Sequence, residues 1–421
     1  MFIGGEIMTT TMDKTLKKET IDIIKSTVPV LEKYGEQITK RFYHLMFSNH
    51  PELLNIFNHA HQKQGRQPRA LAQAVYSAAK YIDQLETILP VVKQIGHKHR
   101  SLGVKPEHYP IVGKHLLLAI KDVLGEAATE EIISAWEEAY GVIADVFIKV
   151  EKEMYEEVLN EPGGWEDFRP FSVVKKVKES TNITSFYLKP MNQNIIKSFL
   201  PGQYISVKVK IPGEDYTHIR QYSLSDSPLN DYYRISVKRE EGTGLHPAGK
   251  VSNYLHDHIQ EGDTLDISAP AGDFTVDLNV STPVIFISGG VGITPLLSMV
   301  KTVVHKQPNR QIHYIHAAIN GQVHAFDKEI KELVKNHENF SYGICYQNPT
   351  ESDKQHPYFI KEGYIDTELL RKVIPAEKSP QVYFCGPVPF MKNIYRSLME
   401  LGIEEAQIFY EFFGPSGSLK E

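Results

Sequence analysis

His99 has the type and position expected of a cofactor ligand. Read at a helical period, the apolar residues around it fall four, three and seven positions apart, at Ile88, Val92, Ile95 and Leu102. His99 follows Ile95 by four residues and fills the gap in this stripe, so we expect its imidazole to face inward. His97 lies off the stripe beside Lys98 and is expected to point to solvent. The stripe alone also fits a core histidine whose ring is satisfied by a neighbouring group.

A second group with chemical potential is Arg220-Gln221-Tyr222-Ser223, which is expected to follow a strand. An extended chain places Arg220 and Tyr222 on one face, where the guanidinium suits a pyrophosphate and the ring suits a planar isoalloxazine. Tyr204 is a second candidate ring. The segment from Gly249 to Leu255 predicts a loop that leads into a helix, whose free N–H groups suit a phosphate. An ordinary strand edge also explains Tyr222.

A glycine-rich turn, Gly289-Gly290-Val291-Gly292-Ile293-Thr294-Pro295, separates an expected buried strand from a helix. It has neither the spacing of the G-x-G-x-x-G fingerprint nor the lysine of a Walker loop, so both of those readings are excluded. It fits a turn that lets a pyrophosphate approach the backbone at the carboxyl end of a strand. Cys385-Gly386-Pro387 ends a later strand on what we expect to be the same edge. Cys385 is either a buried small residue or a residue that packs beside a nicotinamide.

Composition limits the class of protein. With 421 residues, of which 41% are hydrophobic and 23% charged, we expect a soluble globular chain of roughly two to four domains. The net charge of -6 and the even spread of basic residues give no indication of nucleic acid or an acidic membrane surface. Two cysteines exclude a disulfide framework, a thiolate-bound iron-sulfur cluster and a Cys-rich zinc site. We find no signal peptide or membrane span and expect a cytoplasmic protein.

The elements that must position these residues change type twice along the chain. Residues 13 to about 158 have helical periodicity and predict an all-α domain of about seven or eight helices. From Phe168 the pattern alternates, and about five or six strands predict a small antiparallel barrel. After Phe274 buried strands alternate with helices, which predicts a parallel α/β domain. Its expected elements are a helix at Pro295–Val304 and strands at Val284–Ser288, Ile312–His316 and Gln381–Cys385.

Taken together, these features resemble the flavohemoglobins, in which a globin is fused to a ferredoxin-reductase-like module for FAD and NAD(P)H. The matching segments are Lys98-His99, Lys105-Pro106-Glu107-His108-Tyr109, the three motifs above and the terminal Tyr410-Glu411-Phe412-Phe413-Gly414-Pro415. The resemblance covers residues 13 to 417. It implies an extension at 1–12, a globin (heme) domain at 13–158, a linker at 159–167, an FAD-binding barrel at 168–276 and an NAD(P)H-binding α/β domain at 280–417.

On the globin side, the resemblance implies that heme b is held through His99 as the proximal iron ligand. Tyr109 and Glu151 correspond to hydrogen-bonded partners of that ligand. A carboxylate system that accepts the imidazole N–H makes the ligand more electron-donating, which favours oxygen activation. On the distal side, Tyr43 and Gln67 correspond to polar residues, while Leu71 is the apolar distal residue and Phe57 wedges the heme. From pattern alone, Tyr43 and Phe57 are core aromatics and Glu151 is a solvated charge.

In the reductase half, the resemblance implies flavin contacts at Tyr204, Arg220, Gln221, Tyr222, Ser223 and Phe413. The phosphate-binding helix start contributes Gly249, Val251 and Ser252, and the nicotinamide site contributes Gly289 to Pro295 with Cys385, Gly386 and Pro387. Lys98 matches a lysine near the junction of heme and flavin. The strand ending at His316 has no arginine for a 2′-phosphate, which favours NADH over NADPH without deciding between them.

The implied activity is that of an NAD(P)H-dependent nitric oxide dioxygenase, which oxidises NO with O2 to nitrate at a ferrous heme that is re-reduced through FAD. The small molecules NO and O2 are then its partners, and we expect a monomer without stable membrane association. Two alternatives stay open. One is an oxygen or NO sensor or carrier whose reductase resets the heme, and the other is a diaphorase with a heme-free helical domain.

Pro68 departs from the family pattern because it follows Gln67 directly. A residue before proline is pushed out of the α region, so we expect Gln67 to lie before its helix and to reach the distal space less well. Proline is tolerated in a first helical turn, so the helix itself is expected to form. We also expect the loop from Glu241 to Ala248 at the surface.

Overall fold

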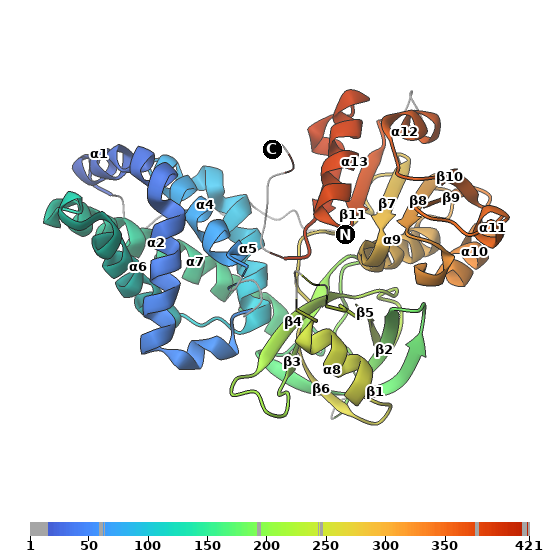
Figure 1. Cartoon of the computed structure of the whole chain (residues 1–421), viewed down its shortest axis with the longest axis horizontal. Coiled ribbons are helices and arrows are strands. Elements are labelled where there is room, and N and C mark those ends of the chain that lie inside the picture. The colour runs from blue at the N-terminus through green and yellow to red at the C-terminus, as the bar shows by residue number, and fades with distance from the viewer. Residues whose placement is uncertain are drawn as a thin grey trace. The chain divides into compact units, whose positions relative to one another are not determined.

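The computed structural model describes residues 16–58, 62, 64–191, 195–242, 244, 247–374, 379–414 and 419. The expected extension at 1–12 lies outside these residues. The chain forms two compact units (Figure 1). The first contains residues up to 53, 59–96 and 104–154, and the second contains 54–58, 97–103 and the chain from 155 onward.

The first unit is helical. The helices of this part of the chain are α1 (Lys18–Ser26), α2 (Val28–Asn49), α4 (Arg66–Lys80), α5 (Leu89–Leu102), α6 (His108–Leu124) and α7 (Glu130–Asn160). Short 3₁₀ helices occupy Pro51–Asn55, Leu85–Ile88 and Gly125–Ala127. Up to Asn160, the described residues form six named α-helices and three 3₁₀ helices, where about seven or eight helices were predicted. The prediction of a helical region is confirmed. The apolar positions Ile24, Ile38 and Phe42 of its helices are buried, as helical periodicity requires.

Helix α7 ends close to the expected boundary at residue 158. Its last residue is Asn160, and Gly163 follows with a φ of 75°. A Cβ on Gly164 would lie 1.7 Å from the Val158 carbonyl oxygen, so the chain can fold back here only because that residue is glycine. Trp165 then donates its indole N–H to the Ile267 carbonyl at 3.2 Å and fixes the end of this turn on the barrel.

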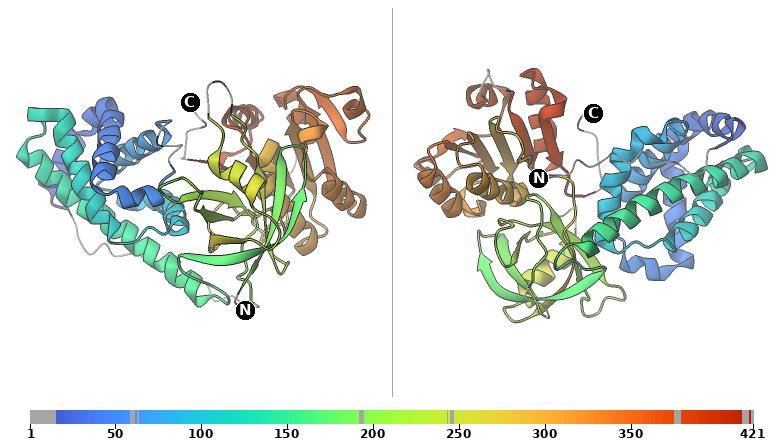
Figure 2. Two further views of the ribbon diagram at one scale, coloured as in Figure 1. Left: turned by 60° about the horizontal axis from the view of Figure 1, so that its bottom comes forward. Right: turned by 180° about the vertical axis from the view of Figure 1, so that it is seen from behind.

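The barrel consists of one antiparallel sheet with the order β4-β3-β6-β1-β2-β5 (Figure 2). The strands are β1 (Phe168–Lys178), β2 (Ile183–Pro190), β3 (Tyr204–Val209), β4 (His218–Ser223), β5 (Tyr233–Lys238) and β6 (Thr264–Ser268). A bridge between Leu224 and Ile235 joins the two edge strands and closes the sheet. Alternate residues such as Phe171, Phe186 and Ile235 fill the interior without solvent exposure. Helix α8 (Lys250–His258) packs through Val251 and Leu255 against the same core.

The last domain is a parallel sheet with the order β10-β9-β8-β7-β11-β12. Its strands are β7 (Val284–Gly289), β8 (Ile312–Ala318), β9 (Phe340–Tyr346), β10 (Phe359–Glu362), β11 (Gln381–Cys385) and β12 (Ile408–Glu411). Its helices are α9 (Ile293–Lys306), α10 (Asp327–Asn336), α11 (Glu351–Lys354), α12 (Thr367–Val373) and α13 (Val388–Glu400).

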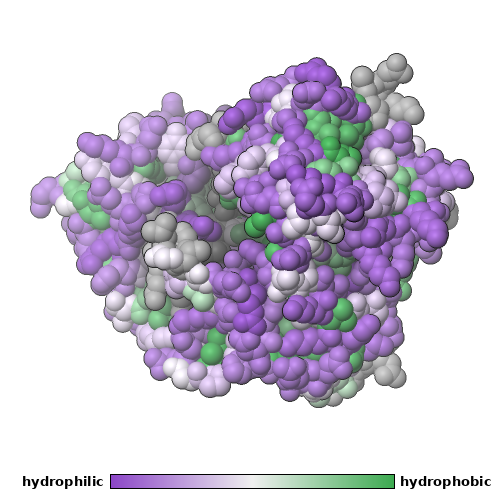
Figure 3. Space-filling view, turned by 45° about the vertical axis from the view of Figure 1, so that its right-hand side comes forward, coloured by the Kyte–Doolittle hydropathy of each residue, from purple (hydrophilic) through white to green (hydrophobic). Residues whose placement is uncertain are grey.

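Both faces of this sheet are covered, as a parallel sheet requires. Along β7, Val284 and Phe286 belong to the core that includes α9 and α10, while Ile285 and Ile287 belong to the core that includes α12 and α13 (Figure 1). The surface in Figure 3 is mainly hydrophilic, with separate hydrophobic patches. None of the helices in the described part of the chain has the length and apolar character that a bilayer span requires.

Candidate functional site

A buried phenol–carboxylate pair lies between two helices of the first unit. The Tyr109 hydroxyl on α6 donates to Glu151 Oε1 on α7 at 2.6 Å, and only 3% of Glu151 is exposed. The Tyr140 hydroxyl holds the backbone of Tyr109 in place by donating to its carbonyl at 2.7 Å. The interpretation of Glu151 as a solvated charge from pattern alone is therefore wrong. A buried carboxylate with one phenol donor has acceptor capacity for a further N–H, which fits the expected partner of an imidazole.

The expected distal phenol is also buried in this unit. Tyr43 on α2 is 7% exposed, and the side-chain amides of Gln62 and Gln67 act on its phenol. Burial raises the pKa of the Tyr43 phenol well above its ordinary value, although the two amides draw it down. The phenol therefore stays protonated and keeps its O–H for donation at any physiological pH. Leu71, on the next turn of α4, is half-buried.

Gln67 does not lie where Pro68 led us to expect. Helix α4 begins at Arg66, so Gln67 is its second residue and Pro68 its third. The predicted displacement of Gln67 out of the helix is wrong, whereas the predicted survival of the helix is confirmed. The reason is that a proline in the first turn removes an N–H that has no helical acceptor anyway. Gly65, with a φ of 68°, supplies the turn into the helix.

His99 lies in the last turns of α5, in the segment 97–103 of the second unit. Its side chain is half-buried, and so is that of Phe57. His97 is half-buried as well, with its Nδ1 shielded from water, so the prediction that His97 points to solvent is wrong. The apolar stripe does not predict the partial burial of His97, because it identifies only the helix face that packs on the core. It does not show which neighbouring elements cover the other faces.

The residues around His99 hold this segment on the barrel. The Arg100 guanidinium donates to the Pro270 carbonyl at 2.5 Å, and the fully buried Ser101 hydroxyl receives hydrogen bonds from Ser206 at 3.1 Å and Gln221 at 2.9 Å. Gln221 therefore contacts this segment through its side chain. Sequence reasoning did not single out Arg100 or Ser101, although a charge and a hydroxyl directly after the candidate histidine are a usable signal.

Strand β4 itself contains Arg220 to Ser223, which corrects the expectation that these residues follow a strand. Arg220 and Tyr222 are two positions apart and therefore lie on the same face of the strand. Ser223 lies on the opposite face and pairs with Tyr204 of β3. Burial lowers the pKa of the Arg220 guanidinium, whose Nη1 donates to the Ile219 carbonyl at 2.7 Å. Among the described residues no carboxylate forms an ion pair with Arg220. A desolvated cation with spare donors is what a pyrophosphate group requires.

The predicted helix after the Gly249 loop forms as α8. Gly249 precedes α8, Val251 is buried, and Ser252 is 8% exposed. The Ser252 hydroxyl donates to the Gly249 carbonyl at 3.1 Å and accepts from the Glu240 amide at 3.2 Å. The described part of the preceding loop is exposed, as expected, at Glu241, Gly242, Gly244, Pro247 and Ala248.

Charged groups converge at the end of β12. The Lys98 ammonium donates to the Gly414 carbonyl at 3.1 Å, and burial lowers its pKa while Glu411 and Asp273 raise it. Burial raises the pKa of the Glu411 carboxyl to about 8, although Lys98 draws it down. Phe413, the expected flavin contact, is 46% exposed. An exposed phenylalanine beside buried polar groups is available to cover a planar ring.

The glycine turn and the Cys385 motif meet at one edge of the parallel sheet, as predicted. Strands β7 and β11 are neighbours, and Ser288 pairs with Cys385. A Cβ on Gly292 would lie 2.2 Å from the Cys385 carbonyl oxygen, so the turn approaches the second motif too closely for any side chain. Gly290 has a φ of 53°. Cys385 is fully buried, and the rest of the turn, from Ile293 to Pro295, forms the buried start of α9.

Three family models match successive parts of the chain. They are Globin over residues 40–147, Oxidoreductase FAD-binding domain over 170–276 and Oxidoreductase NAD-binding domain over 286–396. These ranges agree with the order helical region, antiparallel barrel and parallel α/β domain.

Similar proteins match over almost the whole chain. A flavohemoprotein of Halalkalibacterium halodurans is 57% identical over 405 residues, which cover 96% of this chain and 98% of that protein. A flavohemoprotein of Bacillus subtilis is 55% identical over 406 residues, which cover 96% and 99% of the two chains.

Two solved structures extend the comparison to the fold. The flavohemoglobin of Malassezia yamatoensis, with bound FAD and heme, superimposes with a TM-score of 0.83 at 28% identity, covering 95% of this chain and all of that one. The FAD/NAD-binding domain of nitric oxide dioxygenase from Vibrio cholerae matches at a TM-score of 0.53 and 36% identity. That match covers 59% of this chain and all of the Vibrio domain.

Proposed function

The chain belongs to the flavohemoproteins, and from that membership we propose that it is a nitric oxide dioxygenase that removes NO. It is an NAD(P)H-dependent oxidoreductase whose domains serve heme, FAD and a nicotinamide. The observation that carries the proposal is the presence of all three domains in one chain, over the full length of its relatives. A reductase in the same chain as a globin supplies electrons to the iron after every turnover. A globin that only stores oxygen does not need such a supply.

The proposed heme site uses residues of several helices. His99 is the proposed iron ligand, and the buried Tyr109–Glu151 pair is the proposed acceptor system for an imidazole N–H. Tyr43 is the proposed distal donor, because burial keeps its phenol protonated. Leu71 and Phe57 supply apolar surface around the ring. When bound, the heme supplies the oxidation of NO by O2 to nitrate.

The proposed flavin and nicotinamide sites use the ends of strands. Arg220 holds the flavin pyrophosphate, Tyr222 and Tyr204 pack against its ring system, and the start of α8 binds phosphate. The turn from Gly289 to Pro295, with Cys385 to Pro387, receives the nicotinamide. We propose that the domain boundaries follow the expected ranges 13–158, 168–276 and 280–417, and that the protein acts as a monomer.

Steady-state turnover with both gases tests the proposal. NADH consumption by the heme- and FAD-loaded protein is measured with O2 and NO present together, and nitrate is quantified in the same samples. We expect rapid consumption that depends on NO and a fixed stoichiometry between NO removed and nitrate formed. Slow turnover without stoichiometric nitrate would instead identify a sensor or carrier, and the lack of a Soret band in protein purified with heme supply would identify a diaphorase.

A further inference from the structure

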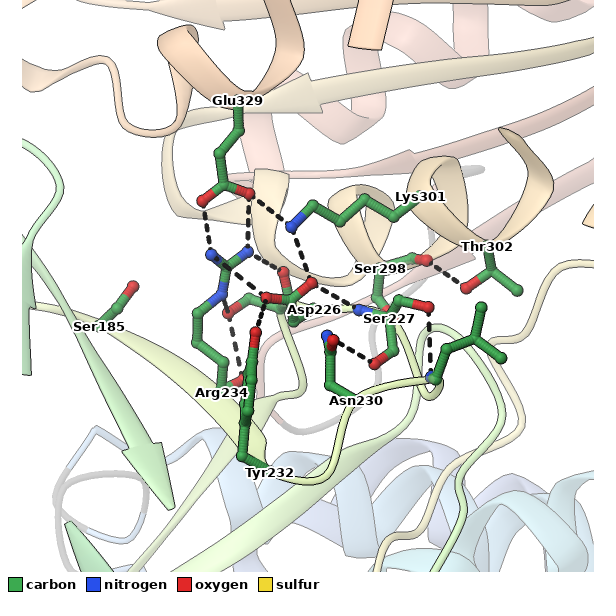
Figure 4. Close-up of polar contacts among 12 residues, drawn as sticks. Ser185, Asp226, Ser227, Asn230, Tyr232, Arg234, Ser298, Lys301, Thr302 and Glu329 are labelled. Atoms are coloured by element: carbon green, nitrogen blue, oxygen red, sulfur yellow. Dashed lines mark hydrogen bonds and ion pairs between the residues drawn. The ribbon is translucent and has the colours of Figure 1, made fainter. Parts of the chain in front are cut away.

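Four charged side chains form a closed network between the barrel and the α/β domain (Figure 4). Asp226 and Arg234 lie within the FAD-binding domain match, and Lys301 and Glu329 lie within the NAD-binding domain match. Arg234 Nη1 donates to Glu329 Oε1 at 2.6 Å, and Lys301 Nζ donates to Asp226 Oδ1 at 2.7 Å. Each domain thus contributes one cation and one anion, and each cation bonds the anion of the other domain.

The network is also closed within each domain. Lys301 Nζ lies 2.7 Å from Glu329 Oε2, and Arg234 Nη1 lies 3.5 Å from Asp226 Oδ2. The arginine side chain is 1% exposed and the Asp226 side chain 6%. Although burial alone would raise them, the pKa values of both carboxyls are lowered, because the Arg234 and Lys301 charges outweigh desolvation. Both carboxyls are therefore held in the ionised form, and removing a partner leaves an uncompensated charge in a largely buried network.

Arg234 reaches into the α/β domain beyond its ion pairs. Its guanidinium lies 4.9 Å from the ring centroid of Phe326, the residue that precedes α10. Phe326 has a φ of 63°, a left-handed conformation that is strained for a non-glycine residue. On the barrel side, Arg234 Nη2 donates to the Ser225 carbonyl at 2.5 Å. The guanidinium is thus held by groups of both domains, and the strained residue lies at the contact between them.

The positions of the network residues connect it to the two cofactor motifs. Asp226 follows Ser223, the last residue of the flavin motif in β4, by three residues. Lys301 lies eight residues after Ile293, on the helix that begins directly after the glycine turn. Because α9 is a continuous helix, a shift at Lys301 moves the turn with it. The Lys301–Asp226 pair therefore joins the two elements that must hold flavin and nicotinamide.

We infer that Asp226, Arg234, Lys301 and Glu329 are positioning residues that align the FAD-binding barrel with the nicotinamide-binding domain for hydride transfer. The inference rests on the proposed use of both sites, but not on the reaction of NO. Hydride transfer requires the donor and acceptor atoms in near contact, and a displacement of about 1 Å can cost about 100-fold in rate. A network that fixes two domains through four ionic contacts limits such displacements.

Lys301→Met and Glu329→Gln test the inference in the heme- and FAD-loaded protein. Anaerobic stopped-flow spectroscopy measures the bleaching of FAD by NADH over a range of NADH concentrations, without NO or O2. We expect the limiting rate of flavin reduction to fall roughly tenfold in each variant, as for a partial misalignment, while the FAD content and the NADH dissociation constant are kept. Lys301→Arg preserves both ion pairs and is expected to restore most of the rate.

A matched control removes an ion pair of the barrel surface. Lys189→Met breaks the exposed Lys189–Asp231 contact of 2.6 Å and is expected to leave flavin reduction unchanged. A second readout needs no turnover, because backbone hydrogen exchange in β5 and in the first turns of α9 and α10 should increase in Lys301→Met and not in Lys189→Met. Lower thermal stability of both network variants with an unchanged limiting rate would overturn the inference and reduce the network to a structural role. A loss of rate in Lys189→Met equal to that in Lys301→Met would overturn it as well.

Discussion

The helical unit and the parallel α/β domain build their sites in opposite ways. In the helical unit, the Tyr109–Glu151 pair joins residues 42 positions apart on two helices, and Tyr43 meets Gln62 and Gln67 from another part of the chain. In the α/β domain, the site is a run of consecutive residues, Gly289 to Pro295, placed beside a second run at Cys385. A helix presents side chains to several neighbours, whereas parallel strands end at one common edge.

This difference decides what a sequence can reveal. Turns at strand ends need particular residues at consecutive positions, so the motif is visible in the sequence itself. Side chains that meet between helices are spread over the sequence and carry no local signal beyond burial. The comparison therefore predicts that a single substitution in the helical unit acts by removing the chemical group of a side chain. A substitution at a strand end should instead act by changing the shape of a turn or by removing a charge that contacts a phosphate. Four substitutions test it, in order of decreasing effect.

His99→Ala is expected to have the largest effect. Loss of the proposed iron ligand should abolish heme retention or the five-coordinate ferrous spectrum, because the imidazole is the proposed protein ligand of the iron. FAD content should stay normal, since flavin residues lie in the barrel. Soret absorbance and extracted flavin of one preparation measure both. His97→Ala serves as the control and should keep its heme, and normal heme with unaltered ligand binding in His99→Ala would remove His99 from the ligand role.

Arg220→Ala is the counterpart in the reductase half. A lost charge-assisted contact to the flavin pyrophosphate costs about 1.5–3 kcal/mol, or roughly 10-fold to 100-fold in FAD affinity. Heme content should be unchanged, which would complete the separation of the two halves. Retained FAD fluorescence is measured after dilution, with Lys208→Ala on the neighbouring strand as the control. Full FAD occupancy of Arg220→Ala at high dilution would contradict the assignment.

Gly292→Ala examines shape alone. The added methyl would lie 2.2 Å from the Cys385 carbonyl oxygen, which is backbone and cannot rotate away, so the turn must move. Overpacking of this kind costs about 1–3 kcal/mol, and we expect a loss of nicotinamide affinity of about tenfold with FAD retained. Titration of NADH against flavin reduction measures it. Gly141→Ala, where a Cβ meets nothing within 4 Å, is the control, and an equal effect in both variants would mean that the contact with Cys385 is unimportant.

The order of the elements was predictable because periodicity reports directly which side of an element is buried. Strand β11 has the predicted ends, Gln381–Cys385. The meeting of Gly292 with Cys385 was predictable as well, because both motifs follow strands of a parallel sheet. Strand β4 was less well predicted, since Arg220 and Tyr222 interrupt the apolar alternation that marks a strand.

What the sequence could not provide is the identity of tertiary partners. The exposure of His97, the burial of Glu151 and the hydrogen bonds of Gln67 all depend on elements far away in the chain. Arg234 is the clearest case, because a charged residue within an apolar strand reads as an outward-facing position. It is instead 1% exposed, since two carboxylates and an aromatic ring surround it. A charged residue in the middle of an otherwise apolar strand is the sequence signal that could have indicated a buried ion pair at Arg234.

The smallest effects concern the distal side chains, where the corrected position of Gln67 changes the argument. Gln67 lies inside α4, and the amides of Gln67 and Gln62 both lower the pKa of the Tyr43 phenol. Removing one amide leaves the other, whereas Tyr43→Phe removes the donor itself. Loss of one hydrogen bond costs about 0.5–1.5 kcal/mol, so we expect Tyr43→Phe to raise the O2 dissociation rate about 2-fold to 12-fold and to lower NO dioxygenase turnover.

Gln67→Ala should change the O2 dissociation rate less than Tyr43→Phe, and Gln62→Ala with Gln67→Ala together should approach the effect of Tyr43→Phe. Stopped-flow measurement of O2 release compares the four proteins. Phenylalanine preserves the ring, so a role of Tyr43 in packing alone predicts a rate equal to that of the unchanged protein. That result, or a larger effect of Gln67→Ala than of Tyr43→Phe, would move the donor role away from Tyr43. The unchanged rate would also contradict the comparison between the two regions, because removing the hydroxyl of the buried Tyr43 would then have no effect on the helical unit's binding of O2.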